Sequence, residues 1–283
     1  MIRQLRFEFE AQESRNPVWS QSSPDFAMFI NALGVDVPHF ERFLVRVMRT
    51  FRAELRDKRL LEDVQNIIGQ ESHHAFNFFR WTKELSRKYP EIALRDQEAR
   101  KYFDRVITRR SKKFQIGFTA GYETFTFLGG MIILDRYKEL MEHADPVLRA
   151  LWIWHQVEEV EHGAVAFDFY RAFYGKHEWY RRYMVVYAFC HIAKETFLAF
   201  RPMVKGEAYR GKRKLKAWWF FWSFAFDLAW AALPVLSSSY HPRNHPICND
   251  DQNSIAVAWR EYHARGNSTD TLTEDDMVQI GTV

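Results

Sequence analysis

Residues 154–163, WHQVEEVEHG, place three carboxylates and two imidazoles in a segment that otherwise reads as an aromatic-rich helix. A helix does not bury that many ionisable groups on or beside its apolar face without a compensating partner. At three- and four-residue steps, the inward positions of this helix are apolar except for His155, Glu159 and His162. The segment therefore predicts a buried polar site.

A second long helix, predicted over 60–88, carries the same spacing in Glu71 and His74. Because an α-helix has about 3.6 residues per turn, residues i and i+3 lie on one face. Each Glu-x-x-His pair can therefore hold one metal ion between a carboxylate oxygen and an imidazole nitrogen. One such pair is a weak signal, but here both pairs interrupt apolar faces.

Two further predicted helices, over about 36–55 and 114–142, each carry one inward acid, Glu41 and Glu123. One Glu from each of two helices, with Glu-x-x-His from each of two others, is the ligand inventory of a di-iron or di-manganese carboxylate bundle. Two divalent ions would balance the four buried carboxylates, whereas these faces offer no inward Lys or Arg for ion pairs. Carboxylate and imidazole ligands without thiolate suit iron, with manganese as an alternative.

The register of the first helix pair agrees with this hypothesis. Asp57 lies in the predicted turn between the two helices. The chain from Glu41 to Asp57 is nearly as long as the chain from Asp57 to Glu71. At about 1.5 Å per residue, the two acids should lie within roughly 3 Å of one level.

The register of the second pair is less regular. The chain from Glu123 to Met141 is longer than the chain from Pro146 to Glu159. The offset is roughly 7 Å at helical rise unless the helix breaks or bulges at the glycines 129–130. The level of Glu123 is thus open at this point.

Four segments, HFERF (39–43), ESHHAFNFF (71–79), WHQVEEVEHG (154–163) and YHPRNHP (240–246), together resemble the bacterial family of predicted metal-dependent hydrolases. The resemblance covers roughly residues 35–250. The four-helix inventory also resembles the ferritin-like di-iron superfamily. The ridge of His155, Glu159 and His162 is similar to that of non-haem di-iron N-oxygenases acting on aromatic amines, which add a histidine to the usual ligand set.

These resemblances imply a role for each candidate ligand. Glu41 and Glu123 would be terminal carboxylates, and Glu71 and Glu159 would bridge the two metals. The nitrogen ligands would be His74, His155 and His162. For His155 the alternative is an imidazole that packs beside the metals without binding them.

Three ionisable residues next to the candidate ligands, His73, Glu158 and Glu161, lie about 100° or more away from the ligand faces. We expect them to hold the ligands in place or to face solvent, because a metal-bound imidazole usually donates its other N–H to a carboxylate or carbonyl. His191 and Glu195, one turn apart in an apolar helix, are candidates for the same role or for lining a substrate pocket.

Three other residues have a structural and a chemical interpretation. Tyr122 is either a packed core tyrosine or a redox-active phenol. His241 and His245 lie in a Pro-rich segment that forms either a structural turn or a second metal site.

Only 12 Gly and 9 Pro among 283 residues, with 47% hydrophobic residues, favour an all-α fold. We predict a ferritin-like four-helix bundle with additional C-terminal helices. The expected divisions are an arm and short helix over 1–35, the di-metal bundle over 36–175, additional packed helices over 176–265 and a disordered tail over 266–283.

The charge and cysteine content exclude several classes of protein. The 40 basic residues are offset by 36 acidic ones, which does not indicate a nucleic-acid partner. Cys190 and Cys248 form no thiolate motif, so a reducing cytoplasmic setting is expected. The N-terminus is too charged for a signal peptide.

Residues 217–236, AWWFFWSFAFDLAWAALPVL, contain one charged residue, Asp227, and directly follow RGKRKLK. Their helical length is about that of a hydrocarbon core, but a central Asp costs about 2.5–3.5 kcal/mol on insertion scales. The segment is either a helix packed on the bundle or at a homodimer interface, a peripheral membrane contact through 212–236, or a span. A helix that covers the bundle would wall a pocket for a hydrophobic or aromatic substrate.

The leading functional hypothesis is an oxygenase or oxidase. Two ferrous ions would use O2 and an external electron donor to oxidise a hydrophobic or aromatic small molecule, with nitrogen as a candidate position of attack. One alternative is a hydrolase in which paired metals lower the pKa of a water molecule. In both, Glu71 and Glu159 would support the catalytic centre. The other alternative is a ferritin-like iron-binding protein without an organic substrate.

Overall fold

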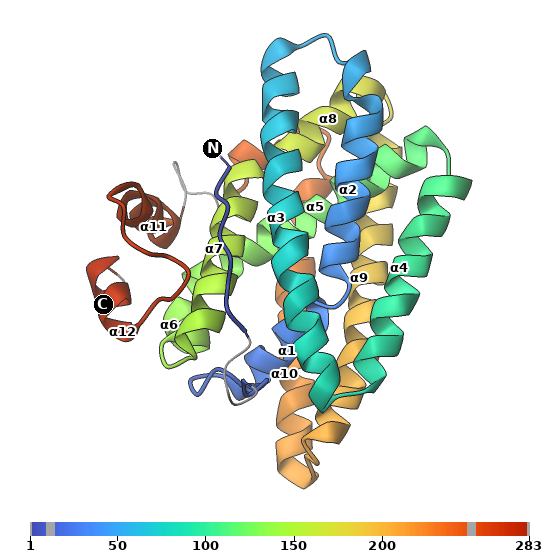
Figure 1. The fold of residues 1–283 in the computed structure, drawn as a ribbon. Helices are drawn as coiled ribbons and strands as arrows, with labels where there is room; N and C mark the ends of the chain where they lie inside the picture. Colours follow the sequence, from blue (N-terminus) through green and yellow to red (C-terminus); the bar gives the residue numbers. More distant parts are fainter. Residues whose placement is uncertain (1, 10–14, 248–252, 282–283) are drawn as a thin grey trace.

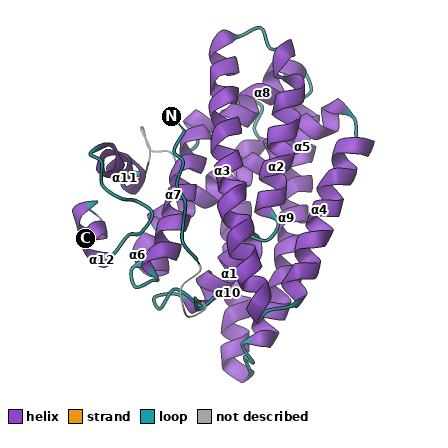
Figure 2. Ribbon diagram, in the orientation of Figure 1, coloured by secondary structure: helices purple, strands orange, loops and turns teal. Residues whose placement is uncertain are grey.

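The structure is a computed structural model that describes residues 2–9, 15–247 and 253–281, and its regular elements are helices (Figures 1 and 2). Within these ranges there is no β-strand, only an isolated bridge between Ser20 and Ala144. The all-α prediction is confirmed.

The longer helices follow one another through most of the chain. In order they are α1 (Pro24–Leu33), α2 (Val37–Phe51), α3 (Lys58–Lys88), α4 (Glu91–Arg109), α5 (Lys112–Asp135), α6 (Tyr137–Met141), α7 (Pro146–His162), α8 (Val165–Tyr174), α9 (Glu178–Gly206), α10 (Gly211–Ala231), α11 (Ser254–Ala264) and α12 (Glu274–Gln279). Side-chain caps fix where several of them begin. The Asp57 side chain accepts hydrogen bonds from the Arg59 and Leu60 amides at the start of α3. The Asp145 side chain likewise accepts from the Val147 and Leu148 amides at the start of α7.

Helices α2 and α3 form one antiparallel pair, and α5 packs against α7 (Figure 1). Helix α5 also packs closely on α9. A Cβ atom at Gly121 would lie 2.5 Å from the Met184 carbonyl oxygen, so only glycine permits this approach of the two backbones. Helix α4 lies against α2 and α3. The result is a four-helix bundle of α2, α3, α5 and α7, with further helices around it.

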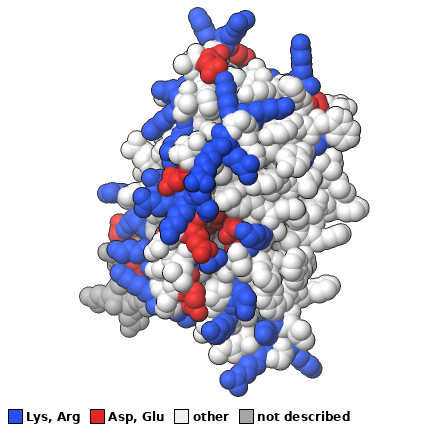
Figure 3. Space-filling model, turned by 90° about the vertical axis from the view of Figure 1, so that its right-hand side faces the viewer, with Lys and Arg blue, Asp and Glu red and all other residues white. Residues whose placement is uncertain are grey.

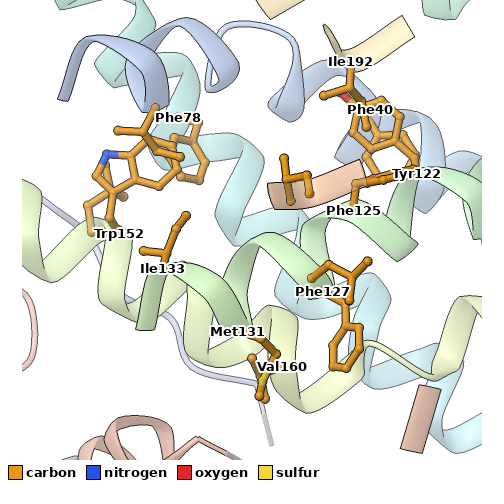
Figure 4. Close-up of a cluster of buried hydrophobic side chains, with 14 of the residues drawn as sticks. Phe40, Phe78, Tyr122, Phe125, Phe127, Met131, Ile133, Trp152, Val160 and Ile192 are labelled. Atoms are coloured by element: carbon orange, nitrogen blue, oxygen red, sulfur yellow. The ribbon is translucent and has the colours of Figure 1, made fainter. Parts of the chain in front are cut away.

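Large aromatic rings fill the spaces between the bundle helices (Figure 4). The Phe78 and Trp152 ring centroids are 4.7 Å apart, and those of Phe40 and Tyr122 are 3.7 Å apart and stacked. This packing isolates the interior of the bundle from water.

The helix that begins at Pro146 is shorter than the sequence predicted. We expected it to continue to about Gly175, but α7 ends at His162 and α8 begins at Val165. A Cβ at Gly163 would lie 2.3 Å from Phe127 Cδ2, so the chain turns where only glycine fits against α5.

The prediction of a disordered tail over 266–283 is wrong for residues 266–281; the last two residues lie outside the described ranges. Thr273 and Asp276 form a reciprocal cap for α12, and Leu272, Met277 and Ile280 are buried. The polar composition of the tail hides these three apolar anchors, which dock beside the start of α7 through the Leu272 amide and Pro146 carbonyl, 3.0 Å apart.

The N-terminal arm packs along the bundle. Phe7 and Phe9 are buried, and the Phe7 amide donates to Asn77 Oδ1 at 3.3 Å. None of the described helices combines the length and hydropathy that crossing a bilayer requires. Of the two cysteines, Cys190 is a free, exposed thiol, and Cys248 lies outside the described ranges.

Candidate metal centre

The structure brings all seven candidate ligands into one buried cluster between α2, α3, α5 and α7. None of the seven is more than 3% exposed. They are Glu41 from α2, Glu71 and His74 from α3, Glu123 from α5, and His155, Glu159 and His162 from α7.

Glu123 reaches the level of Glu159 without a break at glycines 129–130, which lie inside a continuous α5. The chain breaks at Arg136, where α5 ends and the short α6 begins. The length of helix from Glu123 to Asp135, the last residue of α5, is nearly equal to the length from Pro146, the first residue of α7, to Glu159. The offset expected from the sequence disappears because α6 does not extend α5.

The ligand atoms fall into two groups, and within each group all of them lie within 4.8 Å of one another. The first group is Glu41, His74, His155 and Glu159. The second is Glu71, Glu123, Glu159 and His162. Glu159 belongs to both groups, so one carboxylate can contribute to two ions.

In each of the two acids that were expected to bridge the metals, the two carboxylate oxygens face two different imidazoles. Glu71 Oε2 lies 3.5 Å from His74 Nδ1, and its Oε1 lies 2.9 Å from His162 Nε2. Glu159 Oε1 lies 3.1 Å from His155 Nε2, and its Oε2 lies 3.3 Å from His162 Nε2. Glu159 belongs to both ligand groups, as the expected bridging role requires, whereas Glu71 belongs to the second group only.

The cluster fits metal ions because it contains buried polar atoms that make no hydrogen bond of acceptable geometry in the described part of the chain, although some of them lie close to an imidazole nitrogen. Such atoms are costly unless a partner satisfies them. They are Glu41 Oε2, Glu71 Oε1 and Oε2, His74 Nδ1, Glu123 Oε1 and Oε2, and Glu159 Oε1. Two divalent cations among them would satisfy these atoms and neutralise the carboxylates.

The pKa values reflect the crowding of charge. Burial raises the pKa of Glu41 to about 7, and burial with repulsion from Glu159 and Glu71 raises that of Glu123 well above its usual value. Burial opposes the ionisation of Glu159, yet the imidazoles of His162 and His155 hold its pKa well below the usual value. Without metal, protons occupy part of the cluster and metal binding must displace them.

His74 is oriented by a carboxylate on its far side. Its Nε2–H donates to Glu158 Oε2 at 2.9 Å, which leaves Nδ1 facing the cluster. Glu158 is fully buried, and its Oε1 accepts from Arg3 at 3.0 Å. A carboxylate that accepts from a metal-binding imidazole fixes the tautomer and raises its basicity.

His162 is held by a parallel chain of contacts. Its Nδ1 lies 3.3 Å from Gln70 Oε1, and Gln70 Nε2 donates to Glu161 Oε2 at 3.4 Å. Glu161 accepts from both terminal nitrogens of Arg3, at 2.9 and 2.8 Å. Arg3, from the N-terminal arm, thus supports two of the imidazoles, and its guanidinium lies 5.3 Å from the Trp259 ring centroid.

His155 faces the cluster through Nε2, 3.1 Å from Glu41 Oε1, while the Gln156 amide lies 2.9 Å from its Nδ1. These contacts fit both expected roles of His155, a metal ligand and an imidazole that packs beside the metals. Sequence reasoning identified Glu158 and Glu161 as candidates for a supporting role, but it missed Arg3, Gln70 and Gln156. The neutral amides carry no distinctive spacing, and Arg3 is far away in sequence.

A cavity of about 50 Å³ lies beside His155 and Gln156. Side chains from α1, α2, α5, α7, α9 and α10 line it. Most are apolar, among them Phe29, Val37, Phe125, Trp152, Phe221 and Leu228. Their chemistry suits a hydrophobic ligand.

The remaining candidates lie outside the cluster. Tyr122 donates to Asp36 Oδ2 at 2.8 Å and packs in the core. His191 lies 3.9 Å from Asp36, while its neighbours Ile192 and Thr196, not His191 or Glu195, line the cavity.

The loop histidines make contacts that fit a structural turn. His241 Nε2 lies 3.0 Å from Asp168 Oδ1, and His245 Nε2–H donates to the Ala231 carbonyl at 2.9 Å. Neither belongs to a group that could hold a metal within the described residues.

The fold and the cluster define an all-α bundle protein with a buried centre suited to two metals. Residues 1–250 match the family described as predicted metal-dependent hydrolase, and the chain belongs to that family. No curated protein matches the chain, and no solved structure does.

Proposed function

We propose that the chain is a two-metal hydrolase acting on a hydrophobic small molecule. The observation that carries the proposal is the pair of buried ligand groups sharing Glu159. The family supports hydrolysis over the oxidation expected from the ligand set alone. Iron or manganese best suits the carboxylate and imidazole donors.

The ligand residues would hold the ions, with Glu71 and Glu159 between them, His74, His155 and Glu41 on one side, and His162 and Glu123 on the other. When bound, the ions would lower the pKa of a water molecule and polarise a substrate carbonyl. Hydrolysis adds the water oxygen to the carbonyl carbon, breaks the bond to the leaving group and transfers one water proton to it.

Glu123 is the carboxylate best suited to carry that proton. The ligand group that contains Glu123 has one imidazole, whereas the other group has two, so nitrogen ligands crowd it less. Neither Glu123 oxygen has a hydrogen bond in the described part of the chain. One oxygen of Glu123 would face the bound ion, and the other would be free to accept the proton from the water and return it to the leaving group.

The cavity beside His155 would bind the apolar part of the substrate. Its volume of about 50 Å³ is small, so a larger substrate enters only when lining side chains move. The rings of Trp152 and Phe125 would exclude water from the reacting bond.

The experiment is turnover of hydrophobic aryl esters by metal-loaded protein in the absence of oxygen. We expect hydrolysis that Glu159→Ala abolishes. Asp96→Asn is the matched control, because Asp96 contacts His39 at 2.8 Å on the exterior of the bundle helices and not a ligand. Equal turnover by wild type and Glu159→Ala would contradict the proposal.

O2-dependent oxidation is a second candidate, favoured by the ligand set of two single Glu residues and two Glu-x-x-His pairs on four helices. It requires ferrous ions, an external electron donor and O2 as co-substrate. Anaerobic loading with Fe(II) followed by oxygen should then give a transient visible absorption and an oxidised product. Consumption of O2 without any organic product would instead indicate ferritin-like iron oxidation.

A further inference from the structure

A row of large apolar side chains is exposed along α10. Its members recur every three or four residues, and each is more than half exposed. They are Leu215, Trp219, Trp222, Phe226, Trp230 and, just beyond the helix, Leu233, and we name them the α10 stripe. Contiguous exposed apolar surface of this kind marks an interaction site.

The opposite face of α10 is firmly packed, so the stripe is not a consequence of a loose helix. Phe221 and Phe224 are buried, and the Phe29 ring centroid on α1 is 4.8 Å from that of Phe224 and 5.6 Å from that of Phe221. Asp227, the one acid in the segment, lies 2.9 Å from Arg136. The fold therefore presents the stripe outward.

Helix α9 packs against α10 and adds exposed apolar residues at helical spacing. Trp179 is 79% exposed, and Tyr183 and Val186 are each more than half exposed. Arg181 donates to the Val235 carbonyl at 2.7 Å, which ties the start of α9 to the end of the α10 segment. Figure 3 shows a broad area without charged side chains beside a charged area; Lys and Arg lie throughout the charged area and also at the lower end of the molecule.

The turn between α9 and α10 is strongly basic. A cleft of about 850 Å³ there is lined by five basic side chains and one acid, Glu91. The basic residues are Arg95, Arg201, Lys205, Arg210 and Lys214. Tyr209 and Trp218 also line the cleft, which therefore suits anionic headgroups beside an apolar surface.

Charge identifies the occupant of this surface. In a two-fold dimer along α10, the basic end of one copy would need an acidic partner on the other. Residues 217–241 contain no acid except Asp227, which Arg136 already contacts. An anionic bilayer supplies both the negative charge and the apolar boundary that exposed Trp side chains prefer.

We propose that the α9–α10 hairpin docks on the surface of an anionic lipid bilayer, with the α10 stripe at the acyl boundary and the basic cleft on lipid phosphates. The helix lies along the membrane, as amphipathic interfacial helices do. Because Phe221 and Leu228 on the buried face of α10 line the cavity beside His155, the substrate is a membrane-dissolved hydrophobic molecule. That last step alone rests on the proposed function.

The test is co-sedimentation of the full chain with vesicles of phosphatidylcholine, alone or mixed with phosphatidylglycerol. We expect binding to the anionic vesicles that weakens with salt, together with a blue shift of Trp fluorescence. The double variant Trp219→Glu/Trp230→Glu should reduce binding by roughly tenfold or more. Arg210→Glu/Lys214→Glu, at two lining residues of the cleft, should remove the preference for anionic lipid.

The matched control is Leu61→Glu, an exposed position in the first turn of α3. The start of α3 lies at the opposite end of the molecule from α10 (Figure 1). Leu61→Glu should bind vesicles like the wild type, and circular dichroism should show that every variant folds. No binding, equal binding to neutral vesicles, or a dimer that Trp219→Glu/Trp230→Glu dissociates would each overturn the proposal. Glu159→Ala should lose metal yet still bind vesicles, which separates failure of the docking surface from failure of the metal centre.

Discussion

Glu158→Gln isolates the contribution of a residue that touches a candidate ligand without reaching the cluster itself. Glu158 is fully buried between His74 Nε2, at 2.9 Å, and Arg3 Nη1, at 3.0 Å. Glutamine has nearly the same shape, but its single amide oxygen can accept from only one of these donors. The other donor then faces an NH2 group, and His74 loses the negative charge that raises its basicity.

Loss of such a partner typically weakens metal binding by roughly 10–100-fold, which is about 1.4–2.8 kcal/mol. His74 belongs to the first ligand group only. We therefore expect Glu158→Gln to weaken one of two bound equivalents of Mn(II) or Fe(II), with a smaller effect on the other. Anaerobic isothermal titration of metal into the apoprotein measures both.

Asp96→Asn is the control, because Asp96 lies 2.8 Å from His39 in a similar pair that involves no candidate ligand. It should leave both equivalents unchanged. Wild-type affinity of Glu158→Gln at both sites, or an equal loss in Asp96→Asn, would refute the reasoning. Thermal unfolding of the apoproteins checks that neither change acts by unfolding the chain.

Three other predictions concern protons and packing. Because burial raises the pKa of Glu41 to about 7, metal affinity should rise as the pH increases towards 7, by about tenfold per pH unit for this group, and metal binding should release protons. Calorimetry in buffers of different ionisation enthalpy measures the released protons, and a pH-independent affinity would contradict the charge assignment. Burial likewise raises the pKa of Asp36 from 3.8 to about 7, so the folded state binds an extra proton between these pH values and the stability falls as the pH rises. In urea unfolding, the wild type should lose up to about 4 kcal/mol relative to Asp36→Asn across this pH range, whereas the same pH dependence in both proteins would contradict the prediction. Gly163→Ala places a Cβ 2.3 Å from Phe127 and should lower the free energy of unfolding by about 1–3 kcal/mol, whereas an unchanged value would show that α7 and α8 can separate freely.

The sequence contained enough to place most of the centre. The alternation of apolar and ionisable residues at helical spacing identifies which side chains face inward, and one tight turn between α2 and α3 fixes their register. The position of Glu123 along the bundle relative to Glu159 could not be predicted in this way. It depends on α5 ending at Arg136, and no proline or glycine marks that break in the sequence.

The parts that escaped prediction arise from contacts distant in sequence. Arg3 supports two imidazoles from an N-terminal arm whose docking depends on Phe7 and Asn77. The tail was predicted to be disordered from its polar composition, yet Leu272 and Met277 anchor it. In both, a few apolar residues decide the position, and local patterns do not reveal them.

The central claim is that the buried acids and imidazoles enclose a pair of metal ions. Elemental analysis of the chain purified without added metals, followed by anaerobic titration of any apoprotein, tests this claim most directly. We predict about two iron or manganese ions per chain, reduced in Glu159→Ala. A folded wild-type chain that neither contains nor takes up these metals would contradict the account.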